Sequence, residues 1–256
     1  MKAHLNKIYP RRSLLSIFIV QVAVLAAAVP TRANSIVTWG AAQNISGDSD
    51  VSTVGTLVGA FNLGVEGVAD TTVNGVTFTG LAVSGNSVTF GDFNLAATHS
   101  ISGANSVFVD GPFGLSSSYK ALISSSVYTF GIPLTLTMGN LVAGATYQFE
   151  WWINDNGGSG TRTTATAGNS VELASTAGAY GPTSFLPGQF AIGTFIADAT
   201  TFQTITFSSG YFTEINGFQL RQTASVPDTC CTSVLFGLGL LGLAVFSQKA
   251  VSLRKA

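Results

Sequence analysis

The sequence predicts an all-β fold, an antiparallel β-sandwich or barrel, for the central part of the chain. Residues 34–223 contain short runs in which apolar and polar residues alternate, and this period of two is typical of strands that bury one face. Turns rich in glycine and asparagine separate the runs. Long apolar segments lie in residues 1–33 and 224–256, so the chain divides into a leader, one domain and a tail.

The leader, residues 1–33, has the order of a secretory signal peptide. Basic residues come first, an apolar run that predicts a signal helix follows, and the small residues Thr31 and Ala33 stand at positions −3 and −1 before Asn34. We therefore expect export with cleavage before Asn34. An uncleaved N-terminal membrane anchor is the alternative.

Seven alternating runs within the domain are expected to be strands. They lie at residues 74–81, 87–95, 134–138, 147–153, 190–196, 202–207 and 215–221. Short strands at this spacing are typical of sandwiches and barrels.

One segment of the domain departs from the period of two. Between Gly114 and Pro133, apolar residues recur at nearly helical spacing and predict a short helix of two turns. These residues are Tyr119, Leu122, Ile123, Val127 and Phe130.

The charge of the domain differs from that of the whole chain. The 256 residues carry a net charge of −1, but between residues 34 and 223 three basic residues oppose eleven acidic ones, which gives −8. Those basic residues are Lys120, Arg162 and Arg221. A domain with so few cations cannot neutralise a phosphate backbone, so nucleic acid is excluded as a partner. Both cysteines, Cys230 and Cys231, are in the tail, and the domain therefore has no disulfide framework.

The tail, residues 224–256, predicts a transmembrane helix at residues 232–246. This apolar segment is somewhat shorter than the ~20 residues of a comfortable membrane span. It is followed by a basic stop that holds the C-terminus on the cytoplasmic side. The basic residues are Lys249, Arg254 and Lys255.

The start of the tail carries a candidate sorting motif, Val226-Pro227-Asp228. The order of this motif, small residues, a span rich in glycine and leucine and a basic end resembles PEP-CTERM sorting tails, in particular the VPDSG type. The resemblance implies recognition by an exosortase-type membrane enzyme, cleavage near the Pro-Asp pair and transfer to the cell envelope or exopolysaccharide. The departures are Cys230-Cys231, where small residues are usual, and a loose basic cluster.

A second resemblance covers four segments of the domain. The segments are TVNGVTFTG (72–80), LVAGATYQFEWWIND (141–155), GQFAIGTFIAD (188–198) and EINGFQLR (214–221). Their order is similar to a domain found in front of such sorting tails, and it implies a galactose-binding-like jelly roll. For function it implies a disposition toward carbohydrate and no catalytic residues.

The run at residues 147–153 places candidate glycan-binding residues on one face. If the opposite face is turned to the core, polar and aromatic side chains project together, as sugar recognition requires. These candidates are Gln148, Glu150, Trp152 and Asn154. The alternative is that Trp152 packs beneath a loop or a second element.

Few residues point to a metal or to catalysis. Asp48 and Asp50 resemble half of a calcium loop, without the bidentate glutamate, and a turn is the alternative. No other cofactor is expected. His99 is the single histidine of the domain, which makes a catalytic triad improbable. A glycoside hydrolase would need two carboxylates facing each other in a cleft, and the sequence identifies no such pair.

Three functions follow from these features. The first is a non-enzymatic protein of the cell surface, anchored in the membrane through its tail before transfer, that associates with exopolysaccharide. The second is a dedicated carbohydrate-binding, lectin-like module. The third is a secreted glycoside hydrolase.

Overall fold

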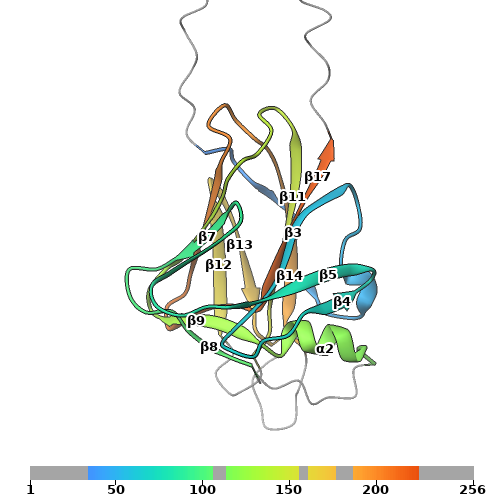
Figure 1. Ribbon diagram of the computed structural model, residues 1–256, viewed down its shortest axis with the longest axis vertical. Helices are drawn as coiled ribbons and strands as arrows, with labels where there is room; N and C mark the ends of the chain where they lie inside the picture. Colours follow the sequence, from blue (N-terminus) through green and yellow to red (C-terminus); the bar gives the residue numbers. More distant parts are fainter. Residues whose placement is uncertain (1–33, 106–113, 156–160, 177–186, 225–256) are drawn as a thin grey trace, which may run out of the picture. The chain divides into compact units, whose positions relative to one another are not determined.

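The computed structural model describes residues 34–105, 114–155, 161–176 and 187–224. Three sheets and two short helices make up these ranges, and Figure 1 shows their arrangement. The prediction of an all-β domain is confirmed.

The large sheet has eight strands. It contains β1 (Thr38–Trp39), β2 (Gln43–Asn44), β3 (Thr56–Gly64), β4 (Thr71–Val73), β5 (Val76–Ala82), β11 (Thr146–Ile153), β14 (Gln189–Ile196) and β17 (Gly217–Ala224). The strand order is β1-β14-β11-β17-β3-β5-β4, with β2 beside β14. Neighbouring strands are antiparallel except β3 and β5, which run parallel. The parallel pair departs from the expected antiparallel sheet.

The second sheet has six strands and faces the large one. It contains β6 (Ser87–Phe90), β7 (Phe93–Ala96), β10 (Leu134–Met138), β12 (Arg162–Ala167), β13 (Asn169–Ala174) and β15 (Gln203–Ser208), in the order β13-β12-β15-β10-β7-β6. Side chains from both sheets meet in one apolar core, where the rings of Trp151 and Phe207 lie 5.0 Å apart. The two sheets therefore form the expected sandwich.

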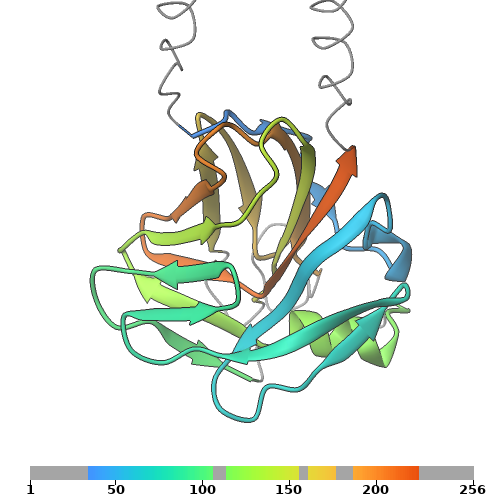
Figure 2. The same ribbon diagram turned by 45° about the horizontal axis from the view of Figure 1, so that its top comes forward.

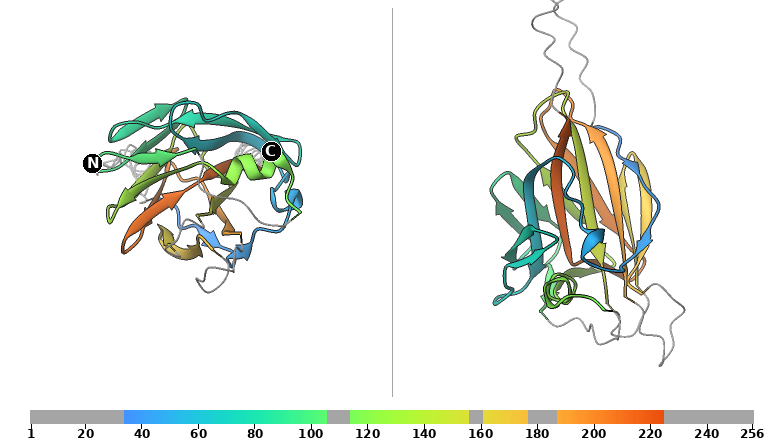
Figure 3. Two further views of the ribbon diagram at one scale, coloured as in Figure 1. Left: turned by 90° about the horizontal axis from the view of Figure 1, so that it is seen from below. Right: turned by 90° about the vertical axis from the view of Figure 1, so that its right-hand side faces the viewer.

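The small sheet consists of β8 (Ser102–Ala104), β9 (Ser126–Phe130) and β16 (Phe212–Ile215), in the order β16-β9-β8. Together with helix α2 (Ser117–Ile123) it lies across one end of the sandwich, as the view from below in Figure 3 shows. A 3₁₀ turn, η1 (Asp48–Asp50), is the other helical element.

The predicted two-turn helix is half right. Ser116 caps its first turn by accepting a hydrogen bond from the Tyr119 amide at 3.1 Å, and the helix ends at Ile123. Val127 and Phe130 belong instead to strand β9. The serine run 124–126 is a poor helix former, and β-strand pairing with β8 and β16 takes over at Ser126.

Strand β11 is buried on both faces. Tyr147, Phe149 and Trp151 point into the core between the sheets, as the alternation predicted. Trp152 points the other way, into a second apolar cluster that includes Phe78 of β5 and Leu122 of α2. Helix α2 lies beside the strands of the large sheet in Figure 2 and covers this outer face.

The two ends of the domain lie together. The Ser35 hydroxyl donates to the Ile196 carbonyl, and Ala224 pairs with Thr146 at the first residue of β11. Strand β17 thus continues one residue past the predicted domain boundary at residue 223. At ~3.3 Å per residue, the far end of β11 is about 25 Å from this point.

The predicted signal peptide (1–33) and nearly all of the predicted tail lie outside the described residues. So do the sorting motif at 226–228, the transmembrane segment at 232–246 and the basic stop at Lys249, Arg254 and Lys255. In the described ranges, no helix has the length and apolar character needed to cross a membrane.

Candidate functional site

The four candidate glycan-binding residues share one face of β11, as predicted, but that face is covered. The exposed fractions of the side chains are 9% for Gln148, 0% for both Glu150 and Trp152, and 1% for Asn154. The prediction of an exposed aromatic platform is therefore wrong. The alternative, that Trp152 packs beneath a second element, describes the structure.

Trp152 is a packing residue. Its indole N–H donates to the Tyr119 hydroxyl at 3.0 Å, and its ring meets Phe78 edge-on at 5.5 Å and stacks on Phe190 at 6.4 Å. Every face of the indole is thus occupied by protein. No sugar can stack on it without displacing helix α2.

Glu150 belongs to a buried polar network. Its Oε2 accepts hydrogen bonds from the Ser52 amide at 3.1 Å and from the side-chain amide of Gln219. The Ser52 hydroxyl donates to Gln148 at 3.1 Å. Burial raises the pKa of Glu150 from its ordinary value of 4.5 to about 8, although the hydrogen bonds from Gln219 and Ser52 oppose the rise. Glu150 is accordingly protonated at neutral pH.

Arg221 extends that network to the segment 53–55. Its guanidinium donates to the carbonyl groups of Thr53, Val54 and Gly55 at 2.9–3.1 Å and to the Gln219 side chain at 3.3 Å. These bonds fasten an irregular segment of backbone over the sheet. The network is structural.

Asn154 is likewise engaged with the backbone. Its side-chain amide donates to the Ile123 carbonyl at 3.1 Å, and its Oδ1 accepts from the Gly188 amide at 2.9 Å. The neighbouring Asn216 side chain donates to three carbonyls, those of Ile123, Ser125 and Asn154. Asn154 therefore joins α2 to the large sheet.

Asp48 and Asp50 form a hydrogen-bonded turn. Asp50 accepts from the Ser46 amide at 2.6 Å and from the Tyr119 hydroxyl at 3.3 Å, and Asp48 accepts from the Ser116 hydroxyl at 2.7 Å. Within the described ranges, no three His, Cys, Asp or Glu side chains are grouped so that they could hold a metal ion. The turn reading accounts for both aspartates, and calcium binding remains a prediction.

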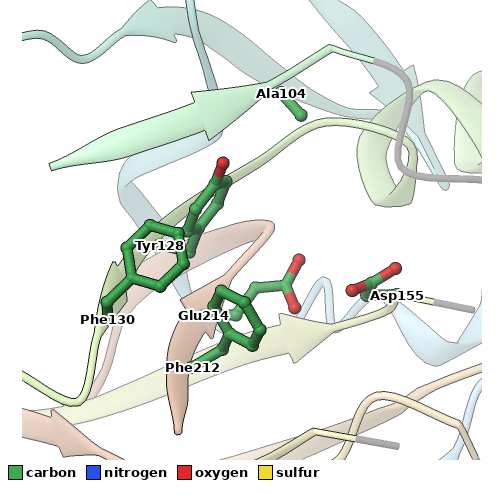
Figure 4. Close-up of a pocket in the computed structure, with 6 residues that line it drawn as sticks. All are labelled: Ala104, Tyr128, Phe130, Asp155, Phe212 and Glu214. Atoms are coloured by element: carbon green, nitrogen blue, oxygen red, sulfur yellow. The ribbon is translucent and has the colours of Figure 1, made fainter. Parts of the chain in front are cut away.

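A pocket forms on the outer face of the small sheet (Figure 4). Residues two apart on a strand share a face, so Tyr128 and Phe130 of β9 project together, as do Phe212 and Glu214 of β16. The register places Phe212 opposite Phe130 and Glu214 opposite Tyr128. Residues of the other face, such as Val127 and Ile215, are buried in the main core. That burial fixes which side chains face the pocket.

The aromatic rings of this pocket form one wall. The ring centroids of Phe130 and Phe212 are 4.8 Å apart, and those of Tyr128 are 5.6 and 5.8 Å from these two. Phe130 is 60% exposed. Ring faces held by neighbouring rings and open to solvent are suited to stacking on a ligand.

Two carboxyl groups lie beside the rings. Glu214 stands on β16, and Asp155 follows the end of β11; Figure 4 shows their carboxyl groups directed toward one another. Ala104 of β8 completes the described lining of a cavity of about 270 Å³. The cavity is thus aromatic on one side and acidic on the other.

The pKa of Glu214 is raised to about 8. Burial is the main cause, since the residue is 3% exposed, and the negative charge of Asp155 adds to it. The Ser126 hydroxyl partly offsets both effects. Glu214 therefore favours its protonated form at neutral pH, which places a hydrogen-bond donor beside the carboxyl group of Asp155 (Figure 4).

A second hollow is lined by Tyr211, the residue that precedes Phe212. Tyr211, 66% exposed, lies edge-on to Phe212 with ring centroids 4.4 Å apart. It lines a cavity of about 310 Å³ together with Arg162 and Glu172, whose side chains are paired at 2.8 Å. Tyr211 thus lines this hollow while its ring contacts Phe212 of the first pocket.

Sequence reasoning missed this pocket. Phe212 and Glu214 alternate with Thr213 and Ile215, and this period-two pattern could have marked Glu214 as facing outward beside an aromatic residue. Nothing in the sequence indicates that Asp155 lies beside Glu214, because 59 positions separate them.

No protein-family model matches the sequence, and no curated protein matches it. Among solved structures, the chain is similar to the enzymatically active domain of bacteriophage CBA120 tailspike protein 4, with 14% identity and a TM-score of 0.27 over 51% of this chain and 18% of that one. The match thus spans less than a fifth of the tailspike chain. Another, described as a carbohydrate-binding module of the β-sandwich superfamily, has 13% identity and a TM-score of 0.15 over 71% of this chain and 99% of that one. Likeness at these TM-scores supports no statement about function.

Proposed function

We propose that this chain is an exported, non-enzymatic protein of the cell surface or exopolysaccharide, and that it binds carbohydrate through the pocket of the small sheet. The observation that carries the proposal is the pairing of an exposed aromatic wall with two carboxyl groups in one cavity. Aromatic faces stack on the apolar faces of sugar rings, and carboxyl groups accept hydrogen bonds from their hydroxyls.

The position of the pocket supports this proposal. Asp155 lies just beyond the far end of β11, whereas Ala224, from which the tail continues, pairs with the first residue of that strand. A tail held in the membrane would leave the pocket at the distal end of the domain. There it would be free to meet an extracellular polysaccharide.

The route to the surface is part of the same proposal. The leader at 1–33 would direct export, and the tail at 224–256 would retain the chain for an exosortase-type enzyme acting at Val226-Pro227-Asp228. Mass spectrometry of the C-terminus of the mature protein tests this part. A C-terminus near Asp228 is expected, and an intact Ala256 in surface material would contradict processing.

A glycan array tests the binding function. The parent chain should be retained on at least one glycan, and Phe130→Ala should weaken retention about fivefold, since an aromatic contact contributes about 1 kcal/mol. Phe202→Ala is the matched control, because Phe202 is also exposed, at 41%, and lies outside the pocket. Equal retention of both variants would refute the proposed site.

Glycoside hydrolysis is a second candidate, favoured by the raised pKa of Glu214 beside Asp155. A protonated Glu214 could give its proton to a glycosidic oxygen while the Asp155 carboxylate activates water or attacks the sugar. Release of reducing ends from the retained glycan measures this activity. Hydrolysis that Glu214→Gln abolishes would establish the enzyme, and intact glycan after prolonged incubation would exclude it.

A further inference from the structure

The described lining of the pocket is aromatic and acidic. Three aromatic rings and two carboxyl groups meet in about 270 Å³, and no basic side chain is among the described residues that line it. Glu214 is 3% exposed, so its carboxyl group is largely cut off from water. A negative charge in such a place is unfavourable unless a positive group accompanies it.

None of the three basic residues of the domain is among the described residues that line the pocket. Arg162 pairs with Glu172 at 2.8 Å, and Arg221 donates to the carbonyls of residues 53–55. Lys120 lies on helix α2. With a net charge of −8 over residues 34–223, the domain attracts cations and repels anionic ligands.

We propose that the pocket binds a cationic amine, with the ammonium group held between the two carboxyl groups and the rings of Tyr128, Phe130 and Phe212. Where the proposed function holds, the ligand is an amino sugar with a free amino group. Aromatic faces attract ammonium groups through their quadrupoles, and cages of several rings are known to select them. An ammonium group can also form salt bridges with carboxylates, which the hydroxyls of a neutral sugar cannot.

A divalent metal ion fits this pocket less well. Calcium takes six to eight oxygen ligands, whereas the described lining supplies two carboxyl groups and one phenol. The rest of the described lining consists of aromatic rings and Ala104. An ammonium group needs only a few acceptors and gains from the rings.

Isothermal titration calorimetry of the 256-residue chain with two oligosaccharides of equal length tests the inference. The β-1,4-linked tetramer of glucosamine is cationic, and the tetramer of N-acetylglucosamine is its neutral counterpart. We expect the cationic tetramer to bind at least tenfold more tightly. Equal or tighter binding of the neutral tetramer would overturn the ammonium inference and leave the sugar site standing.

Two variants assign the effect to the pocket. Glu214→Gln and Asp155→Asn should each weaken binding of the cationic tetramer about tenfold. Asp92→Asn is the matched control, because it likewise replaces a carboxyl group by an amide, on an exposed turn between β6 and β7, and should leave binding unchanged. If all three variants lose affinity equally, binding depends on the net charge of the domain, and the pocket is not the binding site. Circular dichroism of each variant checks that it is folded.

A third probe separates this inference from the proposed function. Tetramethylammonium contains no sugar, and its binding can be followed through the NMR signals of the tyrosine and phenylalanine rings. Saturable shifts that Phe212→Ala removes would support the ammonium pocket even if neither tetramer binds, in which case the sugar proposal fails alone. No binding of either cationic probe would overturn the inference.

Discussion

The indole N–H of Trp152 donates to the hydroxyl of Tyr119 at 3.0 Å, and this hydroxyl in turn donates to the Asp50 carboxyl group at 3.3 Å. The two bonds connect the outer face of β11, helix α2 and the turn at residues 48–50. They show why the face that resembles a sugar platform in the sequence is interior in the structure. Trp152 therefore stabilises the packing of the domain and is not available to a ligand.

Replacement of Trp152 should therefore damage stability. Trp152→Ala would leave a large cavity between Phe78 and Phe190, and we expect a loss of about 3–5 kcal/mol in the free energy of unfolding. Urea denaturation measures it, with Phe202→Ala as the exposed control that should change by less than ~0.5 kcal/mol. If the Trp152→Ala protein is as stable as the parent but no longer binds glycan, Trp152 would be a glycan-binding residue after all.

Stability should fall as the pH rises. The pKa of Glu150 and that of Glu214 are each raised to about 8 in the folded state, against 4.5 ordinarily. Between these values the unfolded chain releases protons that the folded chain retains, so each group lowers the free energy of unfolding by about 1.4 kcal/mol per pH unit. The stabilisation from these two groups is complete below pH 4.5 and is lost progressively between pH 4.5 and 8. Above pH 8 the two groups cause no further change in the free energy of unfolding. Denaturation across this range measures the slope.

Glu150→Gln should halve that slope. The amide oxygen can still accept from Ser52 and Gln219, and the amide nitrogen replaces Oε1, which has no hydrogen-bond partner among the described residues. We expect the variant to be at least as stable as the parent at pH 8. An unchanged slope would mean that Glu150 is ionised in the folded protein at neutral pH.

Arg221→Lys should loosen the segment over the sheet. A lysine ammonium cannot reproduce the planar fork that reaches the carbonyls of Thr53, Val54 and Gly55, and we expect a loss of about 2 kcal/mol. Hydrogen exchange should accelerate at amides 52–55. If exchange there stays as in the parent, the guanidinium is not what fastens this segment.

Gly55→Ala should be more harmful than Gly85→Ala. Both glycines have positive φ, +81° and +77°, so both variants carry the backbone cost of about 1–2 kcal/mol. At Gly55 a Cβ would also lie 2.3 Å from the Gln222 carbonyl oxygen, whereas at Gly85 nothing lies within 4 Å. We expect about 1–3 kcal/mol of additional loss at Gly55, measured by thermal unfolding. Equal losses would contradict the close approach.

The features that depend on the residue pattern within a single strand could be predicted from the sequence. The two faces of 147–153 and the alternation in 134–138 and 202–207 follow from local periodicity, and the structure confirms them. The helix at 117–123 was found because apolar residues recur at helical spacing, but its end was misplaced. Strand pairing at Ser126 depends on β8 and β16, which are distant in the chain.

The candidate site was not predictable by the same means. Alternation says that one face of β11 is polar, but it does not say whether α2 covers that face. Similarly, Glu214 and Asp155 become neighbours only when β16 pairs with β9 beside the end of β11. Burial by a second element and contact between distant segments are tertiary properties, and a single sequence does not record them.

A crystal structure of the chain with the glycan that the array retains best tests most directly whether the pocket of the small sheet binds carbohydrate. We expect a sugar ring stacked on Phe130 or Phe212, with its polar groups within hydrogen-bond distance of Glu214 or Asp155. A glycan seated elsewhere on the domain, with the pocket of the small sheet empty, would contradict this expectation.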